Sequence, residues 1–482
     1  MADNHDWSGW GRDSANTRFQ PAPGLTADAV PKLKLKWAFG FPNESMAASQ
    51  PAVLGEHIFV GSSPGVVYAL HASSGCRYWT YSAGAGVRTA LSVAKLPSGR
   101  WAVFFGDLHA WVHAVDAESG ELLWKVKADD HPAARITGSP SLRAGRLYVP
   151  VSSVEEALAQ SPKYSCCTFR GSVVALDAST GHRIWQSYTV PTPAKPLGES
   201  RSGAQLFGPA GAAVWSAPTI DQRRNLLYVA TGNSYTGAEI RTSDAVLAFD
   251  LETGRLEWSA QLQPGDNFIV GCPFHPNCPE PPGADFDLGA SPVLRTMADG
   301  RRILLTGQKS GMVYGLDPDD RGKVLWKVRL GEGGMLGGIM WGLAADEQSV
   351  YCAVSDRLLG KAGGAGIYAI DMATGAKKWS VPAPPANGNP AQAAAVTAIP
   401  GIVFSGAVNG HLRAYSSATG QIVWDFDTNR AFQTVNGVAA KGGSIDGPGP
   451  VVAHGLVLTN SGYALSGGNG GNVLLAFSAE SK

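Results

Sequence analysis

The chain has 482 residues, of which 60 are glycine, 31 are proline and 14 are tryptophan, and only 16% are charged. This composition excludes a disordered chain and indicates many short strands and turns with aromatic packing. Basic and acidic residues both number 39, and this near-zero net charge gives no support to nucleic-acid binding. No run of about 18 apolar residues is present, which excludes a transmembrane helix.

The chain begins with a polar segment and a single predicted strand. Residues 1–10 lack the apolar stretch of a secretory leader, so we expect either a cytosolic protein or a chain from which the leader is absent. Residues 33–37, LKLKW, predict a strand that ends in tryptophan and has no partner strand before it. This segment therefore looks like the second half of a repeat whose first half is missing.

A repeat with the pattern A-x-D-x-x-T-G-x-x-x-W follows, with some drift. In each copy the apolar run before the aspartate predicts a strand, aspartate and threonine bond backbone groups of a turn, and glycine takes a positive φ. The residues up to the tryptophan predict the next strand, and the tryptophan suits packing between neighbouring sheets. Seven copies end at Trp79, Trp124, Trp185, Trp258, Trp326, Trp379 and Trp424.

The spacing of these tryptophans indicates where insertions lie. Successive tryptophans are 45, 61, 73, 68, 53 and 45 residues apart, whereas a four-stranded propeller blade needs roughly 40 to 50 residues. The insertions therefore fall in the middle of the chain, where insertions on one face usually build the binding face. The Pro/Gly-rich segments 191–213 and 263–284 are expected to shape an open groove or, alternatively, a lid.

The last predicted strand completes the repeat. Residues 472–477, NVLLAF, look like a first half that lacks its tryptophan, and together with residues 33–37 they predict an eighth blade. Closing the ring in this way removes exposed sheet edges. We therefore predict an all-β fold, a single eight-bladed β-propeller domain over residues 1–482 that is closed by its N- and C-terminal strands. An open solenoid of the same repeats is the alternative.

The cysteines bear on the compartment. Cys166 and Cys167 are adjacent, and Cys272 and Cys278 bracket a short proline-rich loop. Two plausible local pairs favour an oxidising compartment. Cys76 and Cys352 are expected as isolated core residues.

Several segments resemble the PQQ-dependent alcohol dehydrogenases, and within them the polyvinyl alcohol dehydrogenase branch. They are the tryptophan repeat, DWSGWGRDSANTRF at the start, SCCTFRGSVVALD, VWSAPTID, DFDLGASPVL and TVNGVAAKGGSIDGPGP. The resemblance covers essentially the whole chain. It implies an enzyme of the periplasm that oxidises a secondary alcohol, polyvinyl alcohol or a similar compound, with pyrroloquinoline quinone (PQQ) and a divalent metal. No C-x-x-C-H motif is present, so we expect either a propeller-only form or a chain from which a haem segment is absent, with electrons passed to a separate cytochrome c.

The resemblance places cofactor contacts in the segments between repeats. Arg88, in GAGVRTALSV, matches an arginine that binds the PQQ carboxylates, and Trp215, in AAVWSAPTID, matches a tryptophan stacked on the PQQ ring. Lys309, in GQKSGMVYGLD, matches a basic residue at the quinone oxygens. The other expected contacts are Thr137, Ser152, Trp341, Cys166 and Cys167. The adjacent cysteines are expected as an eight-membered-ring disulfide near the cofactor or, alternatively, as two reduced side chains.

Metal ligands and a catalytic base are assigned by the same resemblance. Glu155, in VSSVEEA, is the expected carboxylate ligand with Glu156 as the alternative, and Asn233, in YVATGNS, supplies an amide oxygen. In GADFDLGASP, Asp285 is expected as the base, assisted by Lys309, and Asp287 as an added ligand, although the two aspartates could exchange roles. Alternate residues of a strand share a face, so both carboxylates can reach one ion. Calcium is the expected metal, and a lanthanide is the alternative.

Two other functions stay open from the sequence. Propellers with this repeat also serve as non-catalytic scaffolds in the bacterial envelope, and related enzymes act on small primary alcohols or sugars. Each candidate alone also fits a structural role, such as a surface arginine, a core tryptophan or a solvated acidic loop. Their order along successive repeats favours the enzyme. Residues 47–53 lack the acidic residue found in many relatives, and the cysteine pair is displaced, which puts a methanol-type substrate in doubt.

Overall fold

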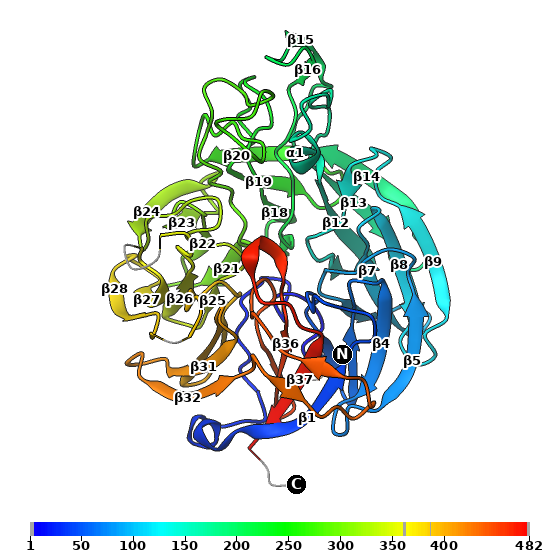
Figure 1. Ribbon diagram of the computed structural model, residues 1–482, viewed down its shortest axis with the longest axis vertical. Helices are drawn as coiled ribbons and strands as arrows, with labels where there is room; N and C mark the ends of the chain where they lie inside the picture. The colour runs from blue at the N-terminus through cyan, green and yellow to red at the C-terminus, as the bar shows by residue number, and fades with distance from the viewer. Residues whose placement is uncertain (1–3, 360–362, 386, 480–482) are drawn as a thin grey trace.

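The structure, a computed structural model, describes residues 4–359, 363–385 and 387–479. Within these ranges, eight antiparallel sheets of four or five strands form a closed ring (Figure 1). The first strands of neighbouring sheets contact one another, so they line the centre of the ring. The chain is therefore an eight-bladed β-propeller, which confirms the predicted fold.

Each blade is a meander whose four main strands follow one another in the chain, except in the last blade. The first four blades consist of β2 (Ala52–Leu54), β3 (His57–Val60), β4 (Val66–His71) and β5 (Arg77–Ser82); β6 (Ser92–Lys95), β7 (Trp101–Gly106), β8 (Trp111–Asp116) and β9 (Leu122–Lys127); β11 (Ser141–Arg143), β12 (Arg146–Ser153), β13 (Ser172–Asp177) and β14 (Arg183–Tyr188), with β10 (Ala134–Arg135) added; and β17 (Thr219–Asp221), β18 (Leu226–Ala230), β19 (Ala245–Asp250) and β20 (Leu256–Gln261).

The next three blades repeat the same order, and the eighth joins both ends of the chain. They consist of β21 (Val293–Thr296), β22 (Arg302–Gly307), β23 (Met312–Asp317) and β24 (Lys323–Arg329); β25 (Ala344–Ala345), β26 (Ser349–Val354), β27 (Gly366–Asp371) and β28 (Lys377–Pro382); β29 (Thr397–Ile399), β30 (Ile402–Gly406), β31 (His411–Ser416) and β32 (Ile422–Asp427); and β35 (Val451–Ala453), β36 (Leu456–Ser461), β37 (Val473–Ser478) and β1 (Lys34–Gly40).

The eighth blade closes the ring as the two half-repeats predict. β1 pairs antiparallel with β37, from Lys34 opposite Ser478 to Gly40 opposite Val473. The N-terminal strand is thus the outer strand of a blade whose other strands come from the C-terminus. The open solenoid is excluded because the eight blades form a closed ring (Figure 1).

The repeat tryptophans join neighbouring blades. The Trp79 Nε1–H donates to the Ala117 carbonyl of the next repeat at 3.1 Å, and Trp37, Trp124, Trp185, Trp326, Trp379 and Trp424 make the equivalent bond. The repeat glycine packs under the ring. Gly120 has a φ of 76° and a Cβ there would lie 2.6 Å from the Trp79 ring, so both its backbone angle and its small size are required.

The N-terminal segment passes across the centre of the ring. Backbone hydrogen bonds connect residues 7–20 to the innermost strands of six blades, β2, β6, β17, β21, β25 and β29. Arg18 is fully buried there, and its guanidinium donates to Val396 O at 2.7 Å and Gln50 Oε1 at 2.7 Å, among other acceptors. The segment therefore ties blades together that are far apart in the sequence.

The remaining elements are short and lie between blades. They are the hairpins β15 (Lys195–Glu199) with β16 (Gln205–Gly208) and β33 (Ala431–Phe432) with β34 (Ala440–Lys441), the helix α1 (Glu155–Leu158), and the 3-10 helices η1 (Ala27–Lys32) and η3 (Leu465–Gly467). No helix in the described part of the chain is long and apolar enough to cross a membrane. Of the two unpaired cysteines, Cys352 is buried as expected, but Cys76 is exposed.

Candidate active site

A cavity of about 380 Å³ lies among the loops at the ends of the blades. Nine of the twelve residues expected in the site line it: Arg88, Thr137, Ser152, Trp215, Asn233, Asp285, Asp287, Lys309 and Trp341. The other three, Glu155, Cys166 and Cys167, do not line it. The segments that the repeat spacing marks as insertions thus meet at one place, although they come from different blades.

One end of the cavity holds a buried network of acids around Lys309. The Lys309 Nζ lies 2.8 Å from Asp285 Oδ1 and 2.7 Å from Asp287 Oδ2. Asp287 Oδ1 also accepts the backbone N–H of Asn233 at 2.7 Å. The second oxygen of Asp285 receives no hydrogen bond from the residues that the structure describes, whereas both oxygens of Asp287 do. Asp285 is therefore the more available of the two carboxylates.

The aspartates converge without the strand expected from their spacing. Residues 284–289 are not in a strand, and Asp285 has a φ of 61°, in the left-handed region. The Asp266 carboxylate accepts the backbone N–H groups of Asp285, at 3.0 Å, and Phe286, and so holds this bend. The prediction of a strand is therefore wrong, although both carboxylates do reach one cation, the Lys309 ammonium.

The protonation of this network follows from its burial. Burial alone lowers the pKa of Lys309, but Asp285 and Asp287 outweigh it, so that pKa ends above its ordinary value and the ammonium stays charged. Burial raises the pKa of Asp285 well above its ordinary value, and Lys309 opposes the rise. Burial also raises the pKa of Glu156 to about 7, with a further contribution from Asp287. Carboxylates in this space outnumber the cation that balances them.

Asn233 is oriented as an oxygen donor. Its Nδ2 donates to the carbonyls of Ser234 and Phe268, both at 2.8 Å. With the amide nitrogen held in this way, Oδ1 lies on the opposite side of the group and accepts no hydrogen bond within the described ranges. Amide and carboxylate oxygens are the ligands that hard cations prefer.

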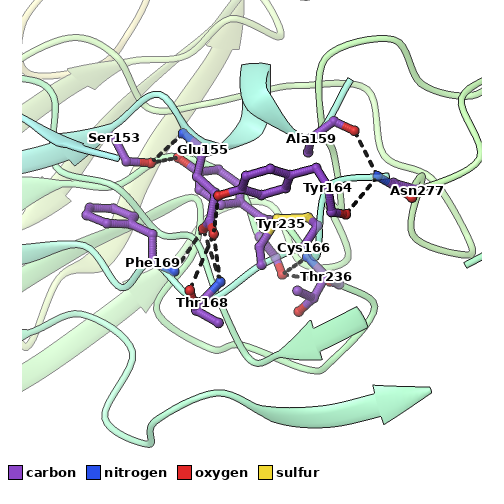
Figure 2. Close-up of a disulfide and its surroundings, with 12 residues drawn as sticks. Ser153, Glu155, Ala159, Tyr164, Cys166, Thr168, Phe169, Tyr235, Thr236 and Asn277 are labelled. Atoms are coloured by element: carbon purple, nitrogen blue, oxygen red, sulfur yellow. Dashed lines mark hydrogen bonds between the residues drawn. A yellow bond between two sulfur atoms is a disulfide. The ribbon is translucent and has the colours of Figure 1, made fainter. Parts of the chain in front are cut away.

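The two adjacent glutamates face different ways. Glu156 lines the cavity, whereas the Glu155 carboxylate accepts the backbone N–H groups of Thr168 at 2.9 Å and Phe169 at 2.8 Å (Figure 2). Glu155 and Glu156 begin α1, and successive helical residues point about 100° apart, so only one of them can face the cavity. The structure therefore turns the expected ligand, Glu155, away and brings the alternative, Glu156, into the cavity.

Cys166 and Cys167 form a disulfide, so the two reduced side chains considered as the alternative are not what the structure has. Both cysteines are buried in the hydrophobic core with Phe169 and Tyr235 (Figure 2). Backbone bonds between Cys166 and the hairpin strand β16 hold the pair there, with Phe207 N donating to Cys166 O at 2.7 Å. Tyr235 lines the cavity, whereas the two cysteines expected near the cofactor are not among the lining residues.

Tryptophan rings separate two basic groups in the cavity. The rings of Trp215 and Trp341 meet edge to face with centroids 5.4 Å apart. The Lys309 Nζ lies 5.5 Å from the Trp215 centroid, and the Arg88 guanidinium carbon lies 4.9 Å from the Trp341 centroid. Gly289 makes room for Trp215, because a Cβ at this position would overlap the indole ring. The arrangement offers flat apolar faces with a cation at either side.

Three further residues complete the wall near Arg88, and residue-by-residue reasoning missed them. The buried Asp446 carboxylate accepts the Trp341 Nε1–H at 2.6 Å and pairs with Arg357 at 2.9 Å. The Tyr463 ring lies 5.7 Å from the Arg88 guanidinium carbon. Burial raises the pKa of Asp446, and Arg357 opposes the rise. This wall has two guanidinium groups and one carboxylate, so its net positive charge favours binding of an anion.

The position within the repeat could have identified two of these residues, Arg357 and Tyr463, as site candidates. Glu156, Asn233 and Arg357 each come three residues after the second strand of a blade, and Lys309 and Tyr463 come two residues after it. All five line the cavity. Reading the chain by position relative to the second strand therefore points to Arg357 and Tyr463.

Both expected local cysteine pairs are formed. Cys272 is bonded to Cys278 across the proline-rich loop, and Cys166 to Cys167. Disulfides persist in oxidising compartments, so these bonds are consistent with an extracytoplasmic location.

Comparison with known proteins gives the same picture. The family described as "PQQ: Glucose/ethanol/alcohol dehydrogenase, beta-propeller domain" matches residues 7–332, and the one described as "Outer membrane protein assembly factor BamB" matches residues 242–481. A polyvinylalcohol dehydrogenase of Pseudomonas sp is 46% identical over 99% of this chain and 77% of its own length. The polyvinylalcohol dehydrogenase of Sphingopyxis sp. (strain 113P3) is 44% identical with the same coverage.

A solved structure supports the fold independently. The quinohemoprotein alcohol dehydrogenase ADHIIG of Pseudomonas putida HK5 matches with a TM-score of 0.74 and 18% identity, covering 100% of this chain and 81% of its own. The similar sequences extend over nearly the whole chain, and the cavity contains the acids, basic residues and tryptophans that the resemblance predicts. The chain belongs to the family of PQQ-dependent alcohol dehydrogenases.

Proposed function

We propose that this chain oxidises secondary alcohols, including the hydroxyl groups of polyvinyl alcohol, with PQQ and a calcium ion in the described cavity. The observation that carries the proposal is the buried Asp285–Lys309–Asp287 network beside Trp215. Burying several acids around one lysine costs free energy, and such groups cluster at functional sites. A non-catalytic scaffold propeller has no need of them. The names of the two relatives at 46% and 44% identity support the substrate.

The cavity fits a divalent cation at its acidic end. Within the described residues, no three His, Cys, Asp or Glu side chains lie close enough to hold a metal by themselves. A cation there needs the Asn233 amide oxygen, together with the Glu156 and Asp287 carboxylates. The carboxylates of Glu156, Asp285 and Asp287 exceed the Lys309 charge by two when ionised, which a calcium ion balances. A lanthanide is the alternative metal.

The opposite wall fits the cofactor. PQQ carries three carboxylates and an o-quinone. When bound, the quinone would accept two electrons and two protons from an alcohol. Arg88 and Arg357 bind the carboxylates, Thr137 and Ser152 add polar contacts, and Trp215 covers the ring face. These groups are already held: the Thr137 and Ser152 hydroxyls lie 2.7 Å apart, and Asp446 fixes Arg357.

Asp285 is the proposed base. Its second carboxylate oxygen, left without a hydrogen bond by the described residues, accepts the hydroxyl proton of the substrate. Lys309 holds the other oxygen and lowers the pKa of Asp285 against the effect of burial. A cation bound beside it would lower that pKa further, so the carboxylate is ionised when the site is assembled. The Trp215 ring lies beside Lys309 at this end of the cavity.

Location and electron acceptor follow as further parts of the proposal. The disulfides support a periplasmic site of action. A cytochrome c is the proposed electron acceptor.

Reconstitution tests the proposal. The protein is incubated with PQQ and Ca²⁺ and assayed for dye reduction with pentane-2,4-diol, polyvinyl alcohol, ethanol and glucose. We expect PQQ- and metal-dependent reduction that is fastest with the diol and the polymer. Faster reduction with ethanol or glucose would move the substrate to small primary alcohols or sugars. A complete lack of dye reduction, with Ca²⁺ or a lanthanide, would favour the scaffold function.

A further inference from the structure

A protrusion stands beside the ring and is formed by three segments that are far apart in the sequence. In Figure 1 it is the part that carries β15 and β16, and its segments are 155–164, 195–208 and 270–284. The Asn277 Nδ2 donates to the carbonyls of Ala159 and Ser161, both at 3.0 Å, and Figure 2 shows the Ala159 contact. Arg201 donates to the His275 carbonyl at 2.9 Å. Hydrogen bonds thus connect the three segments into one structural unit.

The protrusion carries a groove of about 520 Å³. Its apolar lining consists of the rings of Pro273, Pro279, Pro281 and Pro282. One basic residue, Arg201, and one acidic residue, Glu280, also line it. Phe274 is next to Pro273 in the chain and is 90% exposed. The groove is therefore mainly apolar and carries one charge of each sign, and the exposed Phe274 adjoins its lining residue Pro273 in the chain.

The groove is close to the active-site cavity. The segment that forms most of it leaves the cavity at Val270 and returns at Asp285, both of which line the cavity. Pro273 is three residues after Val270, and Pro282 is three residues before Asp285. Consecutive Cα atoms are 3.8 Å apart, so the groove lies within about 11 Å of the cavity lining. The Cys272–Cys278 disulfide closes the loop that presents it.

We propose that this groove binds the polymer chain next to the hydroxyl group that is being oxidised, an inference that rests on the proposed function. The cavity, at about 380 Å³, is near the lower end of ligand pockets and is shared with the cofactor, so only a short piece of a polymer fits inside. The rest of the chain must lie outside it, and the groove is within reach.

The chemistry of the groove suits this occupant. Polyvinyl alcohol is neutral and alternates apolar CH₂ groups with hydroxyl-bearing carbons. Proline rings and the Phe274 ring offer apolar contact for the former. Arg201 and Glu280 offer a hydrogen-bond donor and acceptors for the latter. A strongly charged partner protein would find no complementary charge here.

The double variant Phe274→Asp/Pro282→Asp tests the proposal. Both residues are exposed, so the new charges disturb the groove and not the core. We expect KM for polyvinyl alcohol to rise at least about fivefold and kcat/KM for pentane-2,4-diol to change less than about twofold. The matched control is Leu256→Asp, an apolar-to-acid change on the outer strand β20, where Leu256 is 41% exposed. It should change neither value.

A second readout does not depend on turnover. The protein without cofactor should be retarded in native gels that contain polyvinyl alcohol, and the double variant should not. Equal KM changes for polymer and diol, an unchanged KM for the polymer, or no retardation of the unmodified protein would each overturn the proposal. If no alcohol is oxidised at all, the proposed function fails, yet retardation that the double variant loses still supports the groove.

Discussion

Replacing Asp285 by asparagine tests the proposed base most sharply. The substitution keeps the shape of the side chain and removes its charge. Lys309 stays paired, because Asp287 Oδ2 lies 2.7 Å from its Nζ. The variant should therefore fold as the unmodified protein does. A positioned base contributes about 10² to 10⁴ in rate, or about 3 to 5 kcal/mol of transition-state stabilisation. We therefore expect kcat for a secondary alcohol to fall by that factor, while the Kd for PQQ changes less than about threefold.

The matched variant is Asp287→Asn. It removes a proposed metal ligand and leaves the Asp285–Lys309 pair intact, so its loss of activity should be reversed by raising the Ca²⁺ concentration. Steady-state dye reduction over a Ca²⁺ series distinguishes the two variants. If Asp285→Asn keeps more than about a tenth of kcat, or recovers with Ca²⁺, Asp285 is not the base and the aspartates have the opposite roles.

Three further predictions concern the metal, the cofactor and the fold. Because the pKa of Glu156 is raised to about 7, Ca²⁺ must displace a proton at lower pH, and its affinity in calorimetry should fall as the pH is lowered through 7. Glu156→Gln should weaken this dependence and leave the part that comes from the raised pKa of Asp285, whereas Glu155→Gln should keep it in full. A flat profile in the unmodified protein would contradict the assignment. Gly289→Ala places a methyl group against the Trp215 ring and should weaken PQQ binding about tenfold or more, measured by fluorescence quenching. Unchanged binding would show that the position of the Trp215 indole does not control the affinity for PQQ. Arg18→Ala leaves several buried acceptors without a donor and should lower the free energy of unfolding by about 3 kcal/mol or more in a denaturant titration; a change within about 0.5 kcal/mol would show that the N-terminal segment is not needed to hold the blades.

The fold could be predicted because each repeat contains the residues that form its turn and its contact with the next blade. Gly120, for example, supplies both the positive φ of the turn and the space for Trp79. The half-repeats at the two ends complete each other, and the pairing of β1 with β37 follows from them. These features are short-range or recur in each repeat, so they can be recognised in the sequence.

The site was only partly predictable, because its remaining details depend on direction in space. Sequence order pointed to Asn233, Asp285 and Lys309, which all line the cavity, but it could not tell which glutamate faces it. That choice depends on the phase of the short helix α1 and on the amides of residues 168 and 169, which bind Glu155. The depth of the cysteine pair was unpredictable for a similar reason, because its backbone bonds with β16 hold it in the core.

Binding of PQQ to the protein without cofactor measures the central claim most directly. PQQ is titrated in a calorimeter with and without Ca²⁺. The account predicts one PQQ per chain with a Kd of about micromolar or tighter, dependent on Ca²⁺ and weakened at least about tenfold by Arg88→Ala. No binding at micromolar concentrations, with either Ca²⁺ or a lanthanide, would contradict it and leave a propeller whose buried acids serve another purpose.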